Sequence, residues 1–415
     1  MRKIGILLFA GALGCAQIQP VQAADGARFN EKLVWSFGAG TDGQYPAAGL
    51  VNMNGVLFGT TALGGTKGKG VVFSINPKTG AETVLHSFCT KRHRYCLDGA
   101  TPLAALIEVR GKLAGTTDGG GATARGGAVF LLNPVTRKEK LLYSFCQDFH
   151  CTDGYFPTAS LVEAGGAIYG TTDEGGDNQF GVAFAVDLKT GIERRLHSFC
   201  SLPNCTDGRN SGSGLIVVSG LLYGTTVAGG ADYTGCDNAG CGAVYAIDPK
   251  TGEETVIYSF HGRPDGDGPE GNLLFANGLL YGVTESGGRG SCLGGDGCGA
   301  VFAVDPATGG ETVLYSFCGK ENCADGALPL AGLIAANGML YGTTISGGDY
   351  GRGTVFSVDP ATGEEAALYS FCRKRNCVDG AEPLGSLIDV DSVLYGATQD
   401  GGAYDKGTVF ALIPQ

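Results

Sequence analysis

Residues 311–360 read ETVLYSFCGKENCADGALPLAGLIAANGMLYGTTISGGDYGRGTVFSVDP, and close variants of this stretch fill the chain after its first thirty residues. A Ser-Phe pair recurs every 51 to 61 residues, with its phenylalanines at Phe37, Phe88, Phe145, Phe199, Phe260, Phe317 and Phe371. An Asp-Gly pair recurs in step with it, and each Asp lies eight residues before a leucine, from Asp42 and Leu50 to Asp379 and Leu387. The sequence therefore contains seven repeats of about 55 residues.

Each repeat contains four short apolar runs, which in the quoted stretch read GLIAAN, MLYGTT, GTVFSVD and ETVLYSF. They are rich in Val, Tyr, Phe and Thr and are bounded by Gly, Asn-Gly or Asp-Pro, a pattern typical of β-strands. Asn337-Gly338 between the first two runs predicts a two-residue hairpin. The Asp-Pro-Ala-Thr-Gly segment after the third run predicts a second tight turn.

Four antiparallel strands repeated seven times predict an all-β fold, a seven-bladed β-propeller. The ends of the chain support a closed ring, because residues 31–37 (EKLVWSF) match the last strand of a repeat and residues 407–415 stop one strand short. The first strand would then complete the last blade and leave no free sheet edge. An open β-solenoid is the alternative, but it would not need complementary incomplete ends.

The first 23 residues have the outline of a signal peptide, with Arg2 and Lys3 before an apolar run at 4–13 and small residues at 21–23. Lipidation at Cys15 within ALGC is the rival interpretation. No later run approaches about twenty apolar residues, so we expect no transmembrane segment. We expect residues 31–415 to form one propeller domain in a secreted or periplasmic protein.

The cysteines support export. Apart from Cys15 they form seven close pairs: Cys89 with Cys96, Cys146 with Cys151, Cys200 with Cys205, Cys236 with Cys241, Cys292 with Cys298, Cys318 with Cys323, and Cys372 with Cys377. An even number of cysteines in an exported chain predicts disulfides. Zinc binding is the alternative, but it needs four converging ligands at closer spacing. We expect neither a metal nor a cofactor.

Removal of Arg2 and Lys3 from the 29 basic residues leaves 27 against 41 acidic ones, a formal charge of −14. This balance argues against nucleic acid or an anionic membrane as a partner, because both require a basic face. We expect a monomer whose partner is an extracellular glycan or protein.

One face of the propeller is predicted to carry the variation. The loops after the fourth run and between the second and third runs contain all the length differences and all seven cysteine pairs, whereas the other connections are uniform tight turns. Binding residues concentrate on loops that a rigid scaffold holds. The face with the long loops is therefore the candidate binding face.

Candidate binding residues are those on the long loops that depart from the repeat. They are Arg209, Asn210, Ser211, Asp232, Tyr233, Asp237, His261, Arg263 and Asp267, with Tyr155 and Phe156 as expected exposed aromatics. The Asp of each Asp-Gly pair and the Thr pairs, such as Thr343 and Thr344, recur in almost every repeat. We expect those side chains to hydrogen-bond within their own turns and strands.

Motifs for catalysis are missing, since the chain has no HExxH, no GxSxG and no phosphate loop. His86 and His197 replace the tyrosine of LYSF inside a strand, where we expect them to be packed. Propeller glycosidases and lyases, however, draw catalytic groups from separate blades and leave no short signature. The catalytic residues, if any, stay unknown.

The pattern LYSF…DG..P.AGLI…G.LYGTT..GG….GTVF..DP.TG resembles the GloVer tandem-repeat family over residues 33–412. The resemblance implies an exported bacterial protein with propeller-like repeats and no assigned reaction, so no functional residue follows from it. The leading hypothesis is a secreted, disulfide-stapled binding module for a glycan or a protein. The alternatives are a polysaccharide hydrolase or lyase with a site at the channel mouth, and a structural component of the envelope.

Overall fold

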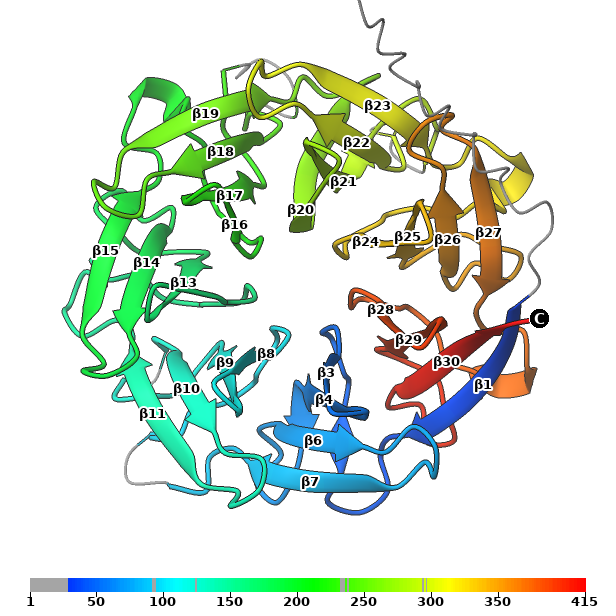
Figure 1. Cartoon of the computed structure of the whole chain (residues 1–415), viewed down its shortest axis with the longest axis horizontal. Coiled ribbons are helices and arrows are strands. Elements are labelled where there is room, and N and C mark those ends of the chain that lie inside the picture. The colour runs from blue at the N-terminus through cyan, green and yellow to red at the C-terminus, as the bar shows by residue number, and fades with distance from the viewer. Residues whose placement is uncertain are drawn as a thin grey trace, which may run out of the picture.

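The chain forms a ring of seven four-stranded antiparallel sheets around a central channel in a computed structural model (Figure 1). The structure describes residues 29–415 except 92–94, 124, 232–235, 237–238, 293–294 and 296. The predicted signal peptide, Cys15, Asp232, Tyr233 and Asp237 lie outside the described residues. The predicted seven-bladed β-propeller is confirmed, and the open solenoid is excluded.

The blades follow one another along the chain. In each blade the first strand lies at the channel and the last strand at the outer edge of the ring (Figure 1). Blade 1 contains β3 (Val51–Met53), β4 (Val56–Thr61), β6 (Val71–Ile75) and β7 (Glu82–Ser87), and blade 2 contains β8 (Ile107–Val109), β9 (Lys112–Thr117), β10 (Ala128–Leu132) and β11 (Glu139–Ser144). Blade 3 contains β12 (Val162–Ala164), β13 (Ala167–Thr172), β14 (Val182–Asp187) and β15 (Glu193–Ser198). Blade 4 contains β16 (Ile216–Val218), β17 (Leu221–Thr226), β18 (Ala243–Ile247) and β19 (Glu254–Ser259).

The remaining blades have the same order. Blade 5 contains β20 (Gly266–Ala276), β21 (Leu279–Gly287), β22 (Ala300–Val304) and β23 (Glu311–Ser316), and blade 6 contains β24 (Ile334–Ala336), β25 (Met339–Thr344), β26 (Thr354–Val358) and β27 (Glu365–Ser370). Blade 7 contains β28 (Ile388–Val390), β29 (Val393–Thr398), β30 (Thr408–Pro414) and β1 (Phe29–Ser36). The loops add the short pair β2 (Gly43–Gln44) and β5 (Leu63–Gly64) and the 3-10 turns η1 (Pro203–Cys205), η3 (Glu321–Cys323) and η4 (Arg375–Cys377).

The ring closes within blade 7, where the N-terminal strand β1 pairs with β30 near the C-terminus (Figure 1). The antiparallel register runs from Phe29 opposite Pro414 to Ser36 opposite Thr408. This pairing confirms the prediction that the first strand completes the last blade, and it covers the outer edge of β30.

The turns between the first two strands are the predicted hairpins. Asn337 and Gly338 have φ angles of 50° and 79°, so both lie in the left-handed region that a type I′ turn requires. Asparagine and glycine reach this region at low cost, which explains why this dipeptide separates the two strands.

The core lies at the seams, by which we mean the contacts between consecutive blades. At each seam the Phe that follows an outermost strand packs against an aromatic ring in the third strand of the next blade, with centroids 4.8 to 5.2 Å apart. The glycine of each second strand makes room for that ring. At Gly59, for example, a Cβ atom would lie 2.6 Å from Cζ of Phe73.

Candidate functional site

Two families of loops share one face of the ring. Entry loops join the outermost strand of one blade to the innermost strand of the next, and middle loops join the second and third strands of a blade. The two families are linked by antiparallel bridges in five blades, such as Ala327 with Ser346. In blade 1 the short β2–β5 pair makes this link.

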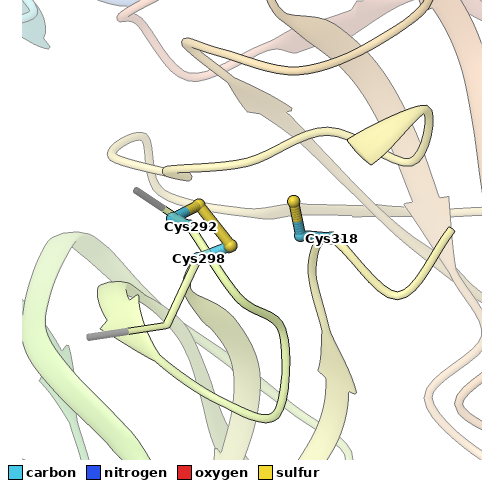
Figure 2. A group of neighbouring side chains, drawn as sticks. All are labelled: Cys292, Cys298 and Cys318. Carbon is cyan, nitrogen blue, oxygen red and sulfur yellow. A yellow bond between two sulfur atoms is a disulfide. The ribbon is translucent and has the colours of Figure 1, made fainter. Parts of the chain in front are cut away.

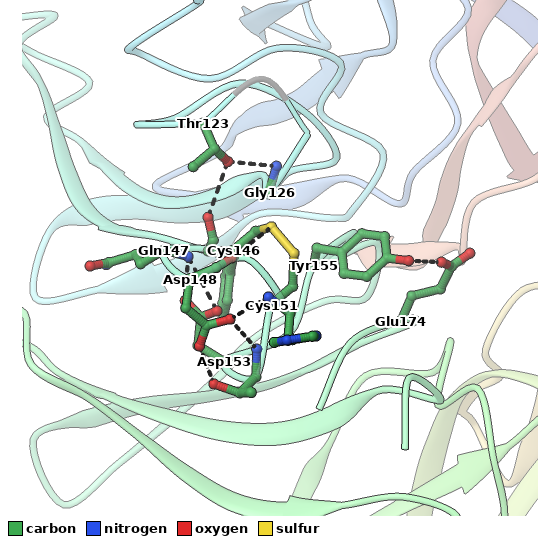
Figure 3. Close-up of a disulfide and its surroundings, with 12 residues drawn as sticks. Thr123, Gly126, Cys146, Gln147, Asp148, Cys151, Asp153, Tyr155 and Glu174 are labelled. Atoms are coloured by element: carbon green, nitrogen blue, oxygen red, sulfur yellow. Dashed lines mark hydrogen bonds between the residues drawn. A yellow bond between two sulfur atoms is a disulfide. The ribbon is translucent and has the colours of Figure 1, made fainter. Parts of the chain in front are cut away.

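The Asp of each Asp-Gly pair holds its own entry loop. Asp325 accepts hydrogen bonds from the Tyr315 hydroxyl at 2.7 Å and from the Gly319 N–H at 2.9 Å. Asp153 has an equivalent partner in the Tyr143 hydroxyl. It also accepts from the N–H of Gln147 beside the Cys146–Cys151 disulfide (Figure 3). These contacts confirm the predicted turn role.

In blade 3 the first Thr of the Thr-Thr pair links blades, whereas the second stays within its own loop. Thr171 donates to the carbonyl oxygen of Ser213 in the next blade at 2.9 Å, and Thr172 donates to the carbonyl of Glu174 at 2.9 Å. The predicted bond within the loop is confirmed for Thr172 and for Thr344, which donates to the Ser346 carbonyl at 2.9 Å. The prediction is wrong for Thr171, which bonds the next blade, and for Thr343, whose buried hydroxyl has no hydrogen-bond partner among the described residues.

The residue three positions after the Asp of each Asp-Gly pair begins a rim around the channel on the loop face. It precedes the proline, or the residue replacing it, by one position, and it has a φ of 56° to 63° in all seven blades. The seven rim residues are Tyr45, Thr101, Phe156, Asn210, Gly268, Leu328 and Glu382. Six of them are not glycine, so this backbone is costly and must be imposed by its surroundings.

Backbone hydrogen bonds impose that conformation. The N–H of Glu382 donates to the carbonyl of Arg352 in the preceding middle loop at 3.0 Å, and the carbonyl of Glu382 accepts from Gln399 N–H at 3.0 Å. Leu328 is held in the same way by Cys298 and Ile345. The rim is therefore a fixed scaffold on which the side chain is free to differ between blades.

The channel opens to the loop face as a cavity of about 580 Å³ to which all seven blades contribute. Its wall is the segment between the rim and the innermost strand, and most of its residues are small, such as Ala48, Ala104, Gly332 and Gly385. None of the described lining residues is Lys or Arg. The result is an open, shallow bowl in which a few polar side chains stand out.

Blade 5 differs most within this wall. Glu270 occupies the place of Leu330 in blade 6, and Asn272 occupies the place of Gly332. The side-chain oxygen of Asn272 accepts a hydrogen bond from Gly214 N–H of blade 4 at 2.9 Å. These two side chains place a carboxyl group and an amide at the cavity.

Further carboxyl groups surround Glu270. Burial, followed by the negative charges of Glu285 and Asp173, raises the pKa of Glu270 to about 7. Burial also raises the pKa of Asp173, which lines the same cavity, and the charge of Glu174 adds to this rise. Asp118 has a raised pKa for the same first reason, with Asp173 as its charged neighbour. The cavity wall thus carries carboxyl groups from blades 3 and 5, and Asp118 of blade 2 lies near the first of them.

Of the predicted site residues, Asn210 and its neighbour Arg209 lie at this rim. The Asn210 side-chain N–H₂ donates to the Asp173 carbonyl at 3.1 Å. The guanidinium of Arg209 lies over the Phe180 ring, 5.3 Å from its centroid. The structure therefore brings Asn210 and Asp173 together, although the sequence analysis had not selected Asp173.

Ser211 is fully buried and supports the core. Its hydroxyl lies 2.7 Å from the hydroxyl of the buried Tyr245 and also donates to the Thr225 carbonyl at 3.1 Å. The other six repeats have Pro in place of Ser211 and Phe in place of Tyr245. The departure at 211 is thus matched by one at 245, because a buried phenol needs a hydrogen-bond partner.

Replacing Ser211 with Ala should lower the free energy of unfolding by about 1–3 kcal/mol, because the Tyr245 hydroxyl would lose its partner in the interior. The double variant Ser211→Ala/Tyr245→Phe should recover much of that loss. Denaturant unfolding of the two single variants and the double variant measures the coupling. A double variant no more stable than Ser211→Ala would contradict the pairing.

The predicted residues of blade 5 brace their loops. The Arg263 guanidinium donates to the carbonyls of Gly295 at 2.6 Å and Arg289 at 3.2 Å. The His261 imidazole lies 3.5 Å from Asp265, whose carboxylate also accepts the His261 N–H at 3.0 Å. Asp267 accepts a hydrogen bond from the Ser286 hydroxyl at 3.1 Å.

Asp267 also lines a second cavity, of about 1030 Å³, on the loops of blades 4 to 6. Glu285 and Ser346 are among its other lining residues. Val227 lines both this cavity and the channel bowl, so the two are neighbours. Together they offer a polar surface that extends outward from the channel.

The prediction that Tyr155 and Phe156 are exposed is wrong, because both are half-buried. Their rings pack at a centroid distance of 4.7 Å, and the Tyr155 hydroxyl bonds the Glu174 carboxylate (Figure 3). That hydrogen bond is the main reason why the pKa of Tyr155 rises to about 12. Phe156 is one of the rim residues, so its backbone position draws the ring against the protein.

All seven predicted cysteine pairs form disulfides. The sulfur atoms of Cys292, Cys298 and Cys318 lie within 4.8 Å of one another, and Figure 2 shows the Cys292–Cys298 disulfide beside Cys318. Cys236 and Cys241 form a similar group with Asp267. Since these cysteines are oxidised, they have no thiolate to offer a metal.

Sequence reasoning missed Glu270 and Asn272, which lie at the start of the first apolar run of the fifth repeat. It also missed Asp118 and Asp173, which begin loops that the sequence analysis had already placed on the candidate face. A signal for two of them was present. The wall segment reads PLAGL in the sixth repeat and PEGNL in the fifth, so Glu270 and Asn272 stand out when repeats are aligned position by position.

The fold and its loop face define a β-propeller that is built from seven copies of one repeat and cross-linked by disulfides. The chain belongs to the Gloeobacter/Verrucomicrobia repeat family, which matches residues 25–236, 96–294 and 231–415. This confirms the family resemblance drawn from the sequence. Comparison with curated proteins gives no match. No helix in the described part of the chain is long and apolar enough to cross a membrane.

Solved structures share the fold at low sequence identity. The extracellular domain of a putative one-component system from B. thetaiotaomicron matches with a TM-score of 0.57 and 11% identity over 94% of this chain and 40% of that chain. This chain thus spans two fifths of that protein. An oligogalacturonate lyase from Vibrio parahaemolyticus matches with a TM-score of 0.53 and 10% identity over 93% and 96% of the two chains. These likenesses show the propeller fold alone.

Proposed function

We propose that the protein is an extracellular or periplasmic binding module that takes a neutral glycan at the channel bowl on its loop face. The observation that carries this proposal is the bowl itself, an open cavity of about 580 Å³ in which blades 3 and 5 break the sevenfold pattern with polar side chains. Ligand sites are typically concave and carry a few placed polar groups on a rigid frame.

The chemistry of the bowl favours a neutral ligand. Carboxyl and amide groups such as Glu270, Asp173 and Asn272 can bind several hydroxyl groups at once, as sugars require. The same carboxylates, with no Lys or Arg among the described lining residues, would repel an anionic polysaccharide. Seven disulfides and the absence of a membrane-spanning helix among the described residues agree with a location outside the cytoplasm.

The test is a thermal-shift and calorimetric screen of the mature protein against neutral and anionic oligosaccharides. A neutral ligand that binds should bind at least tenfold more weakly to the variant Glu270→Leu/Asn272→Gly, because losing such hydrogen bonds costs about 1.4 kcal/mol or more. The variant carries the residues that blade 6 has at these positions, Leu330 and Gly332, so the fold should tolerate it.

Glu364→Gln is the matched control, since Glu364 is an exposed carboxylate on a short turn of the opposite face. It should leave affinity unchanged. If the blade 5 variant bound the ligand as tightly as the wild type, the binding site would lie outside the bowl. Binding of anionic sugars alone would contradict the neutral-ligand class.

The hydrolase or lyase alternative has less support. Oligogalacturonate is the substrate class in the name of the Vibrio parahaemolyticus neighbour, whereas the bowl here is lined by carboxyl groups. The one feature that favours an enzyme is Glu270, whose raised pKa suits a general acid. Analysis of the bound glycan for cleavage products after long incubation separates the two functions.

A further inference from the structure

A glutamate stands at the same place in every blade, near the start of the outermost strand. The seven are Glu31, Glu82, Glu139, Glu193, Glu254, Glu311 and Glu365. In each, Oε1 is buried and accepts no hydrogen bond from any described residue. Burial of an unpartnered carboxylate oxygen is costly. Seven repetitions of such a cost call for a physical explanation.

A second carboxyl group faces each glutamate across the seam, from the Asp of the Asp-Gly turn. Their charges oppose one another where Glu82 meets Asp42, Glu193 meets Asp153, Glu254 meets Asp207 and Glu311 meets Asp265. The same geometry places Glu365 beside Asp325. Two buried carboxylates on one seam repel each other unless a positive charge or a proton intervenes.

At three seams a lysine supplies this positive charge. Lys91 contacts Glu139, Lys320 contacts Glu365 and Lys374 contacts Glu31, each through Nζ and Oε2. Each lysine belongs to the entry loop of the same seam. The three glutamate side chains are only 0 to 2% exposed, whereas the lysine side chains are 48 to 57% exposed, so each lysine reaches a buried carboxylate from the surface.

The other four seams have no such lysine. At the Glu254 seam its place is taken by Leu202, whose backbone angles of φ −97° and ψ 157° match those of Lys320, φ −99° and ψ 158°. The N–H of Leu202 donates to Asp207 at 3.1 Å, as that of Lys320 donates to Asp325 at 3.3 Å. The backbone at Leu202 therefore has the same conformation as at Lys320, although the side chain at this position is not a lysine.

We propose that a lysine neutralises the buried glutamate at three seams of the ring and that a bound proton neutralises it at the other four. The propeller is then most stable in a mildly acidic medium. This goes beyond the proposed glycan binding and does not depend on it. It predicts a ring whose stability senses the pH of the surroundings.

The pKa values agree with this division. Burial, with a nearby Asp in second place, raises the pKa of Glu82, Glu193 and Glu311 from 4.5 to about 7 and that of Glu254 to about 8. A carboxyl group with a raised folded pKa binds its proton more tightly in the folded state. Its contribution to stability is complete below pH 4.5 and is lost as the pH rises through 7 to 8.

Other charged groups at these seams do not alter the direction. Glu193 also faces Arg194 and Arg195, which lower its pKa in part, and Asp153 is bonded by Tyr143. Tyr258 bonds Asp265 beside Glu311. At the Glu254 seam His197 lies 3.3 Å from Asp207. Trp35 faces Asp42 beside Glu82.

The test is thermal unfolding between pH 5.5 and pH 8.5 of the wild type, Leu202→Lys and Glu254→Gln. The wild-type midpoint should fall by several degrees across this range. Both variants should raise the midpoint at pH 8.5 by about 2 °C and change it little at pH 5.5, because each removes the same unneutralised charge by different means. His197→Tyr, which introduces the residue found at four other seams, provides a background without the histidine.

Val135→Lys is the matched control for net charge, because Val135 is 88% exposed and lies on a turn of the opposite face. Its effect should be equal at both pH values. A wild-type midpoint that does not fall with rising pH would overturn the proposal. So would a Leu202→Lys variant that stabilises equally at pH 5.5 and pH 8.5.

Discussion

Replacing Phe37 with Ala is expected to lower the free energy of unfolding by about 3–5 kcal/mol. The Phe37 ring is 0% exposed and packs edge-on against Phe73, with 5.0 Å between ring centroids. It directly follows β1, the strand that closes the ring, so its loss would leave a cavity where the N-terminal strand is anchored to blade 1. Chemical denaturation followed by tryptophan fluorescence measures the change, since Trp35, the only tryptophan, is two residues away.

Two controls give the result its meaning. Phe149→Ala makes the same substitution at a ring that is 94% exposed, and it should leave stability unchanged. Phe317→Ala empties the equivalent position at an internal seam, where Phe317 packs on Phe356 at 4.9 Å, and should cost as much as Phe37→Ala. A Phe37 variant as stable as the Phe149 variant would show that ring closure does not depend on this contact.

The fold was predictable because its signals are local and repeated. The Asn337-Gly338 turn, the Asp-Gly turns and the four apolar runs each carry their own conformational preference, and seven copies reinforce one another. Ring closure followed from counting strands at the two ends. The short innermost strands were less predictable. Most keep only three residues, such as Ile334–Ala336, because the segment before them lines the channel instead of pairing.

The site was predictable only as a face. The sequence showed which loops vary. On that face Asp267 lines a cavity, and Asn210 donates a hydrogen bond to Asp173, which lines the channel bowl. The sequence did not show that Ser211 is the hydrogen-bond partner of Tyr245, because those residues are 34 positions apart and come into contact only in the folded protein. Arg263 likewise departs from the repeat in order to brace carbonyls of a neighbouring loop. A departure from a repeat marks either a ligand site or a compensated core, and only contacts distinguish them.

The entry loops raise the question of what holds them, the disulfide or the aspartate. Asp379 is 0% exposed and accepts hydrogen bonds from the Tyr369 hydroxyl at 2.7 Å, Arg373 N–H at 2.9 Å and Lys374 N–H at 3.1 Å. Two entry loops lack the cysteine pair and keep the aspartate contacts. In them Gly38 N–H donates to Asp42 at 3.0 Å, and Tyr258 donates to Asp265 at 2.8 Å. The aspartate is therefore the common element.

Asp379→Ala is accordingly expected to cost about 3 kcal/mol or more, because three donors would lose a charged acceptor inside the protein. The double variant Cys372→Ala/Cys377→Ala should cost less, about 2 kcal/mol, since that disulfide closes a loop with a sequence separation of only 5. Denaturant unfolding of both variants compares the two terms. A larger loss in the cysteine variant would mean that the disulfide determines the loop, and the loops of Asp42 and Asp265 would then need another source of order.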